Sequence, residues 1–194
     1  MSKLSRDNLY SLEQYAEMRP EYRQKVMQHK KKRRIFLGDN ATLYFESELT
    51  MRYQVQEMLR IEKIFDKEGI EEELAAYNPM IPDGKNWKAT FMIEFSDEND
   101  RKAALAKMIN IEEKVYVLVE GFDPVWAIAD EDLERNTEEK TSSVHFMRFE
   151  LTDEMIAALR NGKGLSMGID HPAYTVKVDI TDEKIRTTLM EDLH

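Results

Sequence analysis

Two stretches with one shared pattern, ATFMIEFSDE at residues 89–98 and HFMRFELTDE at residues 145–154, decide the fold that the sequence predicts. In the first seven positions of both, apolar or aromatic side chains occupy every second position. This two-residue period is typical of a β-strand with one covered face. The letters SDE and TDE that follow are helix-capping sequences. Each strand is therefore expected to lead directly into a helix.

The segments after the two expected helices also match. KVYVLVEGFDPVWAIA and GLSMGIDHPAYTVKV each indicate two strands that turn near a proline, at Pro124 and Pro172. The sequence thus predicts two related strand–helix–strand–strand units at 89–128 and 145–178. A duplication would explain the match, but two unrelated units of this kind would share the same caps and the same alternation.

The N-terminal part, residues 1–86, is expected to be mostly helical, with a break at Pro20 and a β-hairpin that turns at Gly38. Residues 87–194 are expected to form the α+β part of one compact unit. Alternating strands favour an antiparallel sheet with one covered face. The prediction is therefore an α+β fold, in which the helical N-terminal part and the hairpin pack on a mainly antiparallel sheet built from the two units.

Composition narrows the function classes. The chain has 194 residues, 38 acidic and 28 basic side chains, a formal net charge of −10 and no cysteine. Disulfides, thiolate nucleophiles and thiolate metal ligands from this chain are therefore excluded. We expect no sequence-specific DNA binding, because phosphate backbones repel an acidic protein. The sequence contains neither a membrane span nor a secretory signal, so we expect a cytoplasmic protein without membrane contact.

Four residues are the candidates for a ligand, partner or metal site. Helical spacing places Glu62 on the apolar stripe of the helix expected from residue 48 to 65, while Glu57 falls on another side and is expected to be solvated. A buried carboxylate must be neutralised, paired or bound to a cation. His145 lies on the apolar side of its strand and His171 lies at a turn; Glu94 lies near the end of the first alternating strand, just before Phe95.

The alternative interpretation of each candidate is structural. Glu62 would then reach the rim of its helix and pair with a cation, and each histidine would be a hydrogen-bonded core or edge residue. The acidic segment DEDLERNTEEKTSS, residues 130–143, could be a lid over a site or a solvated connector. Ser142 and Ser143 do not form a catalytic triad with the nearby histidine, because no orienting acid is specified.

Five longer stretches carry a resemblance to a known family. They are NLYSLEQYAEMRPEYR, YQVQEMLRIEKIF, YNPMIPDGKNWKATFMIEF, AIADEDLERNTEEKTSSVHFMRFEL and MGIDHPAY. With these motifs the chain resembles the bacterial family catalogued as domain of unknown function 3501, from about Leu4 to Leu193. Family members are often encoded near rubrerythrin-like and iron–sulfur oxidoreductase proteins. The resemblance therefore implies a redox or peroxide-defence setting and a redox protein as partner, but no catalytic residues.

Three hypotheses about function follow from the sequence. The first is a non-enzymatic accessory or ligand-binding protein that serves a redox system, because no local nucleophile, nucleotide-binding or metal motif is present. The second is a metal-dependent or acid/base enzyme whose site converges from Glu62, Glu94, His145 and His171. The third is an anion or nucleic-acid binder that uses the basic run 30–34. The sequence indicates no particular cofactor or metal and no oligomeric state.

Overall fold

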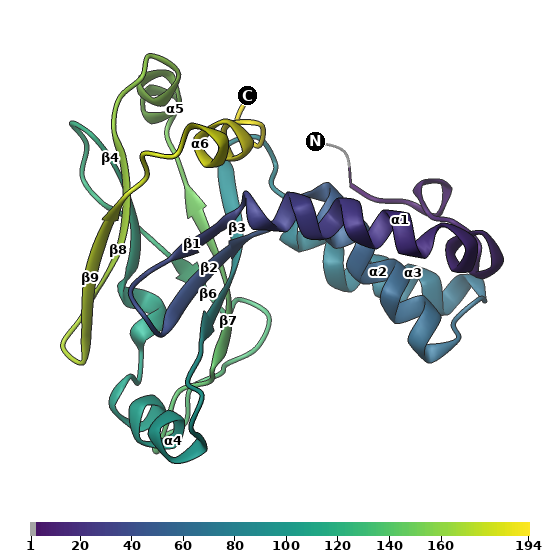
Figure 1. Cartoon of the computed structure of the whole chain (residues 1–194), viewed down its shortest axis with the longest axis horizontal. Helices are drawn as coiled ribbons and strands as arrows, with labels where there is room; N and C mark the ends of the chain where they lie inside the picture. Colours follow the sequence, from purple (N-terminus) through teal and green to yellow (C-terminus); the bar gives the residue numbers. More distant parts are fainter. Residues whose placement is uncertain (1–2) are drawn as a thin grey trace.

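The computed structural model describes residues 3–194 and confirms the α+β class (Figure 1). The helices are α1 (Leu12–Lys31), α2 (Glu48–Glu62), α3 (Lys67–Tyr77), α4 (Glu98–Lys107), α5 (Asp153–Arg160) and α6 (Glu183–Met190), with short 3-10 turns η1 (Arg6–Asn8), η2 (Asn78–Met80) and η3 (Ile111–Lys114). The strands are β1 (Arg34–Phe36), β2 (Ala41–Phe45), β3 (Asn86–Ile93), β4 (Val115–Val119), β5 (Val125–Trp126), β6 (Ile128–Ala129), β7 (Val144–Glu150), β8 (Leu165–His171) and β9 (Tyr174–Asp179). No helix within residues 3–194 combines the length and apolar character needed to cross a lipid bilayer.

The strands form two antiparallel sheets, which we call the body of the molecule. The first sheet has the order β1-β2-β3-β7-β6 and the second has the order β5-β4-β8-β9. The hairpin β1–β2 extends the first sheet at its edge, so it joins the sheet itself rather than packing on its face. The short neighbours β5 and β6 belong to different sheets, and the single residue between them, Ala127, links the two.

The two matched segments contain the same order of elements. Strand β3, helix α4 and strands β4 and β5 make the first set, and β7, α5, β8 and β9 make the second. Equivalent strands pair with each other, because β3 lies beside β7 and β4 lies beside β8. The superposition of the two sets, and the duplication that it would indicate, stays a prediction.

The two sheets share one apolar core, and the alternation of β3 and β7 determines which side chains enter it. Trp87, Ala89, Phe91 and Ile93 of β3 are buried, and the intervening side chains are partly exposed. On β7 the inward positions are held by His145, Met147 and Phe149, again in alternation. Phe91 and His145 are direct cross-strand partners. The strand pattern therefore places a polar ring on the core side of the first sheet.

Helices α1, α2 and α3 form a separate lobe that projects from the body (Figure 1). Helix α1 continues through Pro20, so the break expected there does not occur. Ser11 caps its first turn, and Gln14 completes the capping box. Helix α2 lies between α1 and α3 and buries side chains on both flanks. The missing hydrogen bond at one proline is thus tolerated in a helix that is packed along its length.

Arg33 joins distant parts of the chain at the boundary between the lobe and the body. Its guanidinium is 1% exposed and donates to the main-chain carbonyls of Phe45 and Glu46, at 3.0 and 2.9 Å. It also donates to the carbonyl of Thr188, at 2.6 Å, and forms a buried ion pair with Asp192. A buried guanidinium with four hydrogen bonds therefore connects the β1–β2 hairpin to the residues around the end of α6.

Candidate metal centre

His145 is completely buried on the inward face of β7, and both nitrogens of its ring face acceptors. On one side, Nε2 lies 3.0 Å from the carbonyl oxygen of Ser142 and 3.0 Å from Oγ1 of Thr141. A carbonyl oxygen only accepts hydrogen bonds, so this contact assigns the hydrogen of a neutral ring to Nε2. In this tautomer Nδ1 carries a lone pair, whereas in a protonated ring both nitrogens donate.

Asp130, the residue immediately after β6, faces Nδ1 of this ring. Its Oδ2 lies 2.6 Å from Nδ1 of His145, and its Oδ1 accepts from the main-chain N–H of Phe146 and from Arg135, each at 3.1 Å. The backbone of Asp130 is in the left-handed region, with φ of 52°. Asp is one of the few residue types that tolerate this conformation, which turns the chain and directs the carboxylate toward the ring.

Arg135 supplies the nearest cation to this carboxylate. It is 13% exposed, stacks on the ring of Phe146 at 4.7 Å and also pairs with Asp132 at 2.7 Å. The hydrogen bonds to Asp132 raise the pKa of the guanidinium, so Arg135 stays charged. Asp130 is consequently held in place on one oxygen by the guanidinium and a main-chain amide, while its other oxygen faces His145.

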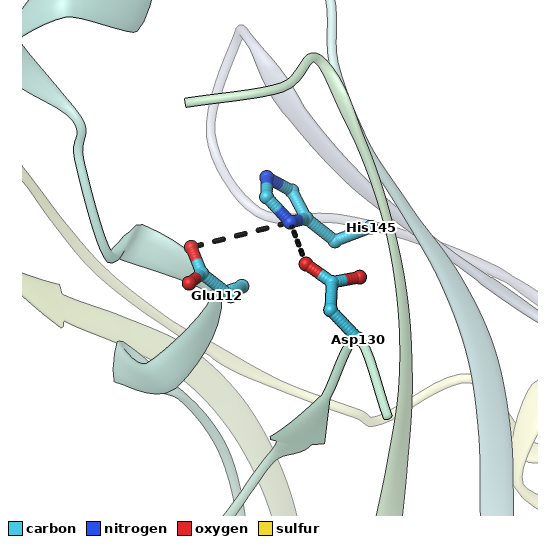
Figure 2. Close-up of side chains that lie close together, drawn as sticks. All are labelled: Glu112, Asp130 and His145. Atoms are coloured by element: carbon cyan, nitrogen blue, oxygen red, sulfur yellow. Dashed lines mark hydrogen bonds and ion pairs between the residues drawn. The ribbon is translucent and has the colours of Figure 1, made fainter. Parts of the chain in front are cut away.

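Glu112 brings a second carboxylate to the same ring nitrogen (Figure 2). It lies in η3 and is only 4% exposed. Its Oε1 accepts from Nδ2 of Asn136 at 2.5 Å, whereas its Oε2 lies 4.0 Å from Nδ1 of His145 and has no hydrogen-bond partner within residues 3–194. A buried, unpaired carboxylate oxygen is costly, so this atom requires a positive species or a donor nearby.

Together these three side chains form a compact set of donors. One ligand atom from each of Glu112, Asp130 and His145 can be chosen so that all lie within 4.8 Å of one another. Two acceptors separated by 2.6 Å, such as Nδ1 and Oδ2, need a proton between them or a cation shared by both. Two ligands on one ion are about 2.9–3.3 Å apart when each bond is about 2.0 Å. Small movements of the side chains would therefore admit a metal ion.

Nucleophilic catalysis fits the same residues poorly. Thr141, His145 and Asp130 occur in the order of a hydroxyl–imidazole–carboxylate triad. However, Thr141 is buried, and the carbonyl of Ser142 competes for the ring nitrogen that would have to accept the hydroxyl proton. The arrangement is therefore better suited to holding a cation than to activating the threonine.

The structure brings one of the four predicted site residues, His145, into this cluster. His171 is buried, but its Nε2 donates to the carbonyl of Ile109 at 3.0 Å and its Nδ1 accepts from the N–H of Ala173 at 3.1 Å. Both ring nitrogens are thus used by the backbone. Glu94 is exposed and accepts a long hydrogen bond from Thr42 at 3.3 Å.

The burial predicted for Glu62 is wrong. Glu62 is the last residue of α2 and is exposed, and Lys63 takes the left-handed conformation that ends the helix. The buried acid of this helix is Glu57, which accepts from Arg19 at 2.7 Å and from the hydroxyl of Tyr15 at 2.8 Å. Because α2 packs against two helices, the apolar stripe alone does not describe its buried surface.

Glu112, Asp130 and Asn136 are the residues that sequence reasoning missed. They are separated along the chain and meet only through the pairing of β6 with β7 and the position of η3. Asp130 and Asn136 both belong to the acidic segment 130–143, whose charge suggested solvent. One signal for these partners was present in the sequence. It was His145, because a polar ring on the covered face of a strand needs polar partners inside the core.

Comparison with known proteins identifies relatives of unknown function. The sequence profile of a family described as Protein of unknown function (DUF3501) matches residues 3–193. A crystal structure of a novel protein of unknown function from Burkholderia pseudomallei is similar to the chain, with 50% sequence identity, a TM-score of 0.93 and 100% coverage of both chains. No curated protein matches the chain. The match over nearly its whole length shows that the chain belongs to the DUF3501 family.

Proposed function

We propose that the protein is an accessory protein that binds one divalent transition-metal ion between Glu112, Asp130 and His145. The single observation that carries the proposal is the buried Nδ1 of His145, which faces two carboxylates, one with an unpaired oxygen. Two carboxylates meet at one ring nitrogen, and the adjacent cation, Arg135, also pairs with Asp132, so the cluster can accommodate further positive charge. A divalent ion would supply it.

The chemistry of the donors indicates the class of ion. Imidazole nitrogen suits Zn²⁺, Fe²⁺ and similar first-row ions, whereas Ca²⁺ takes six to eight oxygen ligands and Mg²⁺ usually keeps several water molecules. A set of one nitrogen and two carboxylates in a buried setting therefore favours Zn²⁺, Mn²⁺ or Fe²⁺. Burial of the donors also favours holding an ion over turning over a substrate, which supports an accessory role ahead of the enzyme hypothesis.

A redox protein as partner and a cytoplasmic location remain parts of the proposal. The resemblance to a family whose members are encoded near rubrerythrin-like proteins supports the first, and the cysteine-free sequence without a secretory signal is compatible with the second. An iron-binding accessory protein would suit that setting. Co-purification of the untagged protein with partners from its own host would test this part independently of the metal site.

The test is a titration of chelator-treated protein with Zn²⁺, Mn²⁺ and Fe²⁺, each added alone, the last under anaerobic conditions. We expect one ion per chain and a loss of affinity of at least 100-fold in Glu112→Gln. Glu113→Gln is the matched control, because Glu113 is the exposed neighbour in the same turn. The proposal is wrong if the unmodified protein binds none of the three ions stoichiometrically, or if the Glu112 and Glu113 variants bind equally well.

A further inference from the structure

We call the segment 131–143 the site loop. It brings a fourth side chain, Asn136, to the cluster of Glu112, Asp130 and His145. Asn136 donates from Nδ2 to Oε1 of Glu112 at 2.5 Å. Its own Oδ1 is buried and has no hydrogen-bond partner in the described part of the chain, residues 3–194. An amide oxygen and a carboxylate oxygen, both buried and unpaired, therefore belong to two side chains that contact each other.

The orientation of the Asn136 amide depends on what lies beside Glu112. Next to the carboxylate alone, the NH₂ group must face Glu112, because two oxygens at that separation would repel each other. Next to a divalent cation, the preference reverses and the amide oxygen faces the positive charge. The two orientations have nearly the same shape, so a half-turn of the amide exchanges a hydrogen-bond donor for a metal ligand.

We propose that Asn136 supplies the fourth protein ligand to the ion, so that binding of the ion fastens the site loop over the centre. This inference rests on the proposed function. Three protein donors leave a four-coordinate ion with one position to fill, and an amide oxygen is an accepted ligand for hard and borderline ions. The loop is anchored by Asp130, the residue immediately before it, and by Thr141 near its end, and both contact His145.

Two substitutions separate coordination from a purely orienting role. Asn136→Ala removes both the donor and the ligand, and we expect the affinity for Mn²⁺ and Zn²⁺ to fall 10- to 100-fold. Asn136→Asp keeps an oxygen ligand but cannot donate to Glu112. If Asn136 coordinates the ion, the aspartate variant binds at least as tightly as the unmodified protein. If Asn136 only orients Glu112, the aspartate repels it and binds more weakly than the alanine variant.

The measurements are the electron paramagnetic resonance signal of free Mn²⁺ and competition for Zn²⁺ with a coloured chelator. Glu138→Gln, an exposed change in the same loop, is the control for altered charge. Thermal melts in chelator confirm that each variant is folded before titration. Unchanged affinity in Asn136→Ala, or weaker binding by the aspartate than by the alanine variant, overturns the inference about Asn136 while the proposed ion site stands. Failure of the unmodified protein to bind overturns both.

Discussion

Glu57 in the helical lobe and Glu112 in the body are both buried acids on helical segments, yet their partners differ. Glu57 accepts from both Nε and Nη2 of Arg19, at 2.7 and 2.9 Å, and from the hydroxyl of Tyr15. Glu112 accepts from the neutral amide of Asn136, and its second oxygen faces the ring of His145 across 4.0 Å.

The contrast separates a structural carboxylate from a candidate ligand. The hydrogen bonds from Arg19, together with those from Tyr15 and Arg60, lower the pKa of Glu57 to about 2 against the opposing effect of burial. Its charge is balanced within the lobe and needs nothing further. Arg135 pairs with Asp130 and Asp132, whereas the hydrogen-bond partner of Glu112 is the neutral amide of Asn136, so Glu112 lacks a guanidinium partner within residues 3–194. Burial alone therefore does not mark a site, whereas burial without a counter-charge does.

The largest expected effect is a loss of stability on substitution of Glu57, which would not accompany the same substitution of Glu112. In chelator, Glu57→Gln should lower the free energy of unfolding by about 2–3 kcal/mol, because Arg19 loses its carboxylate and Tyr15 loses a charged acceptor. Glu112→Gln should stay within about 0.5 kcal/mol of the unmodified protein, because the amide still accepts from Asn136 and removes a repulsive charge. Denaturant unfolding measures both values. Equal losses in the two variants would show that Glu57 and Glu112 have the same structural role.

A smaller effect is expected in how the free energy of unfolding decreases at acidic pH. The lowered pKa of Glu57 means that its contribution is complete above its ordinary pKa and is lost as pH falls from about 4.5 toward about 2. Burial lowers the pKa of His29 to about 4, so its protonation weakens the fold earlier, as pH falls from about 6.5 to 4. Unfolding measured at a series of pH values should show both declines in the unmodified protein. In Glu57→Gln the first decline remains and the second becomes shallower; an unchanged second decline contradicts the assignment.

His145 and His171 are both buried, and substitution of His171 tests whether only His145 takes part in ion binding. His171→Ala should lower the free energy of unfolding by about 1–2 kcal/mol, because the carbonyl of Ile109 and the N–H of Ala173 lose their partner. The affinity for Zn²⁺ should not change, since both nitrogens of this ring are already hydrogen-bonded. A tenfold weaker titration with Zn²⁺ would return His171 to the list of ligands.

The smallest effects are expected at the two exposed acids. Glu62→Gln and Glu94→Gln should each change the free energy of unfolding by less than about 0.5 kcal/mol, as for other surface substitutions, and leave ion affinity unaltered. Titration calorimetry with Zn²⁺, run beside the Glu112→Gln variant, is the measurement. Loss of Zn²⁺ binding in either variant would show that the site includes residues outside the cluster of Glu112, Asp130 and His145.

Features encoded within a few residues could be predicted from the sequence. The inward alternation of β3 and β7 and the caps at Asp97 and Thr152 need only local spacing and side-chain chemistry. His145 was correctly placed on the covered face for the same reason. The class of fold followed from these elements together.

The remainder of the site depends on tertiary contacts. Glu112 reaches His145 across 33 positions of sequence, and Asp130 does so across 15. No spacing rule brings such residues together before the strand order is known. The error at Glu62 has a related cause, because a helical wheel describes one contact face, and α2 is the middle of three helices. The continuity of α1 through Pro20 likewise depends on packing rather than on local preference.

Arg33 has a consequence for the order in which a newly made chain can fold. Its contacts with Thr188 and Asp192 span 155 and 159 positions, whereas the apolar contacts within the α1–α3 lobe join residues no later than Ile81. During synthesis the lobe can therefore assemble before most of the body has been made. The guanidinium of Arg33, in contrast, stays solvated until Thr188 and Asp192 have been synthesised. The body, whose pairings of β3 with β7 and of β4 with β8 also join distant residues, is therefore expected to fold more slowly than the lobe.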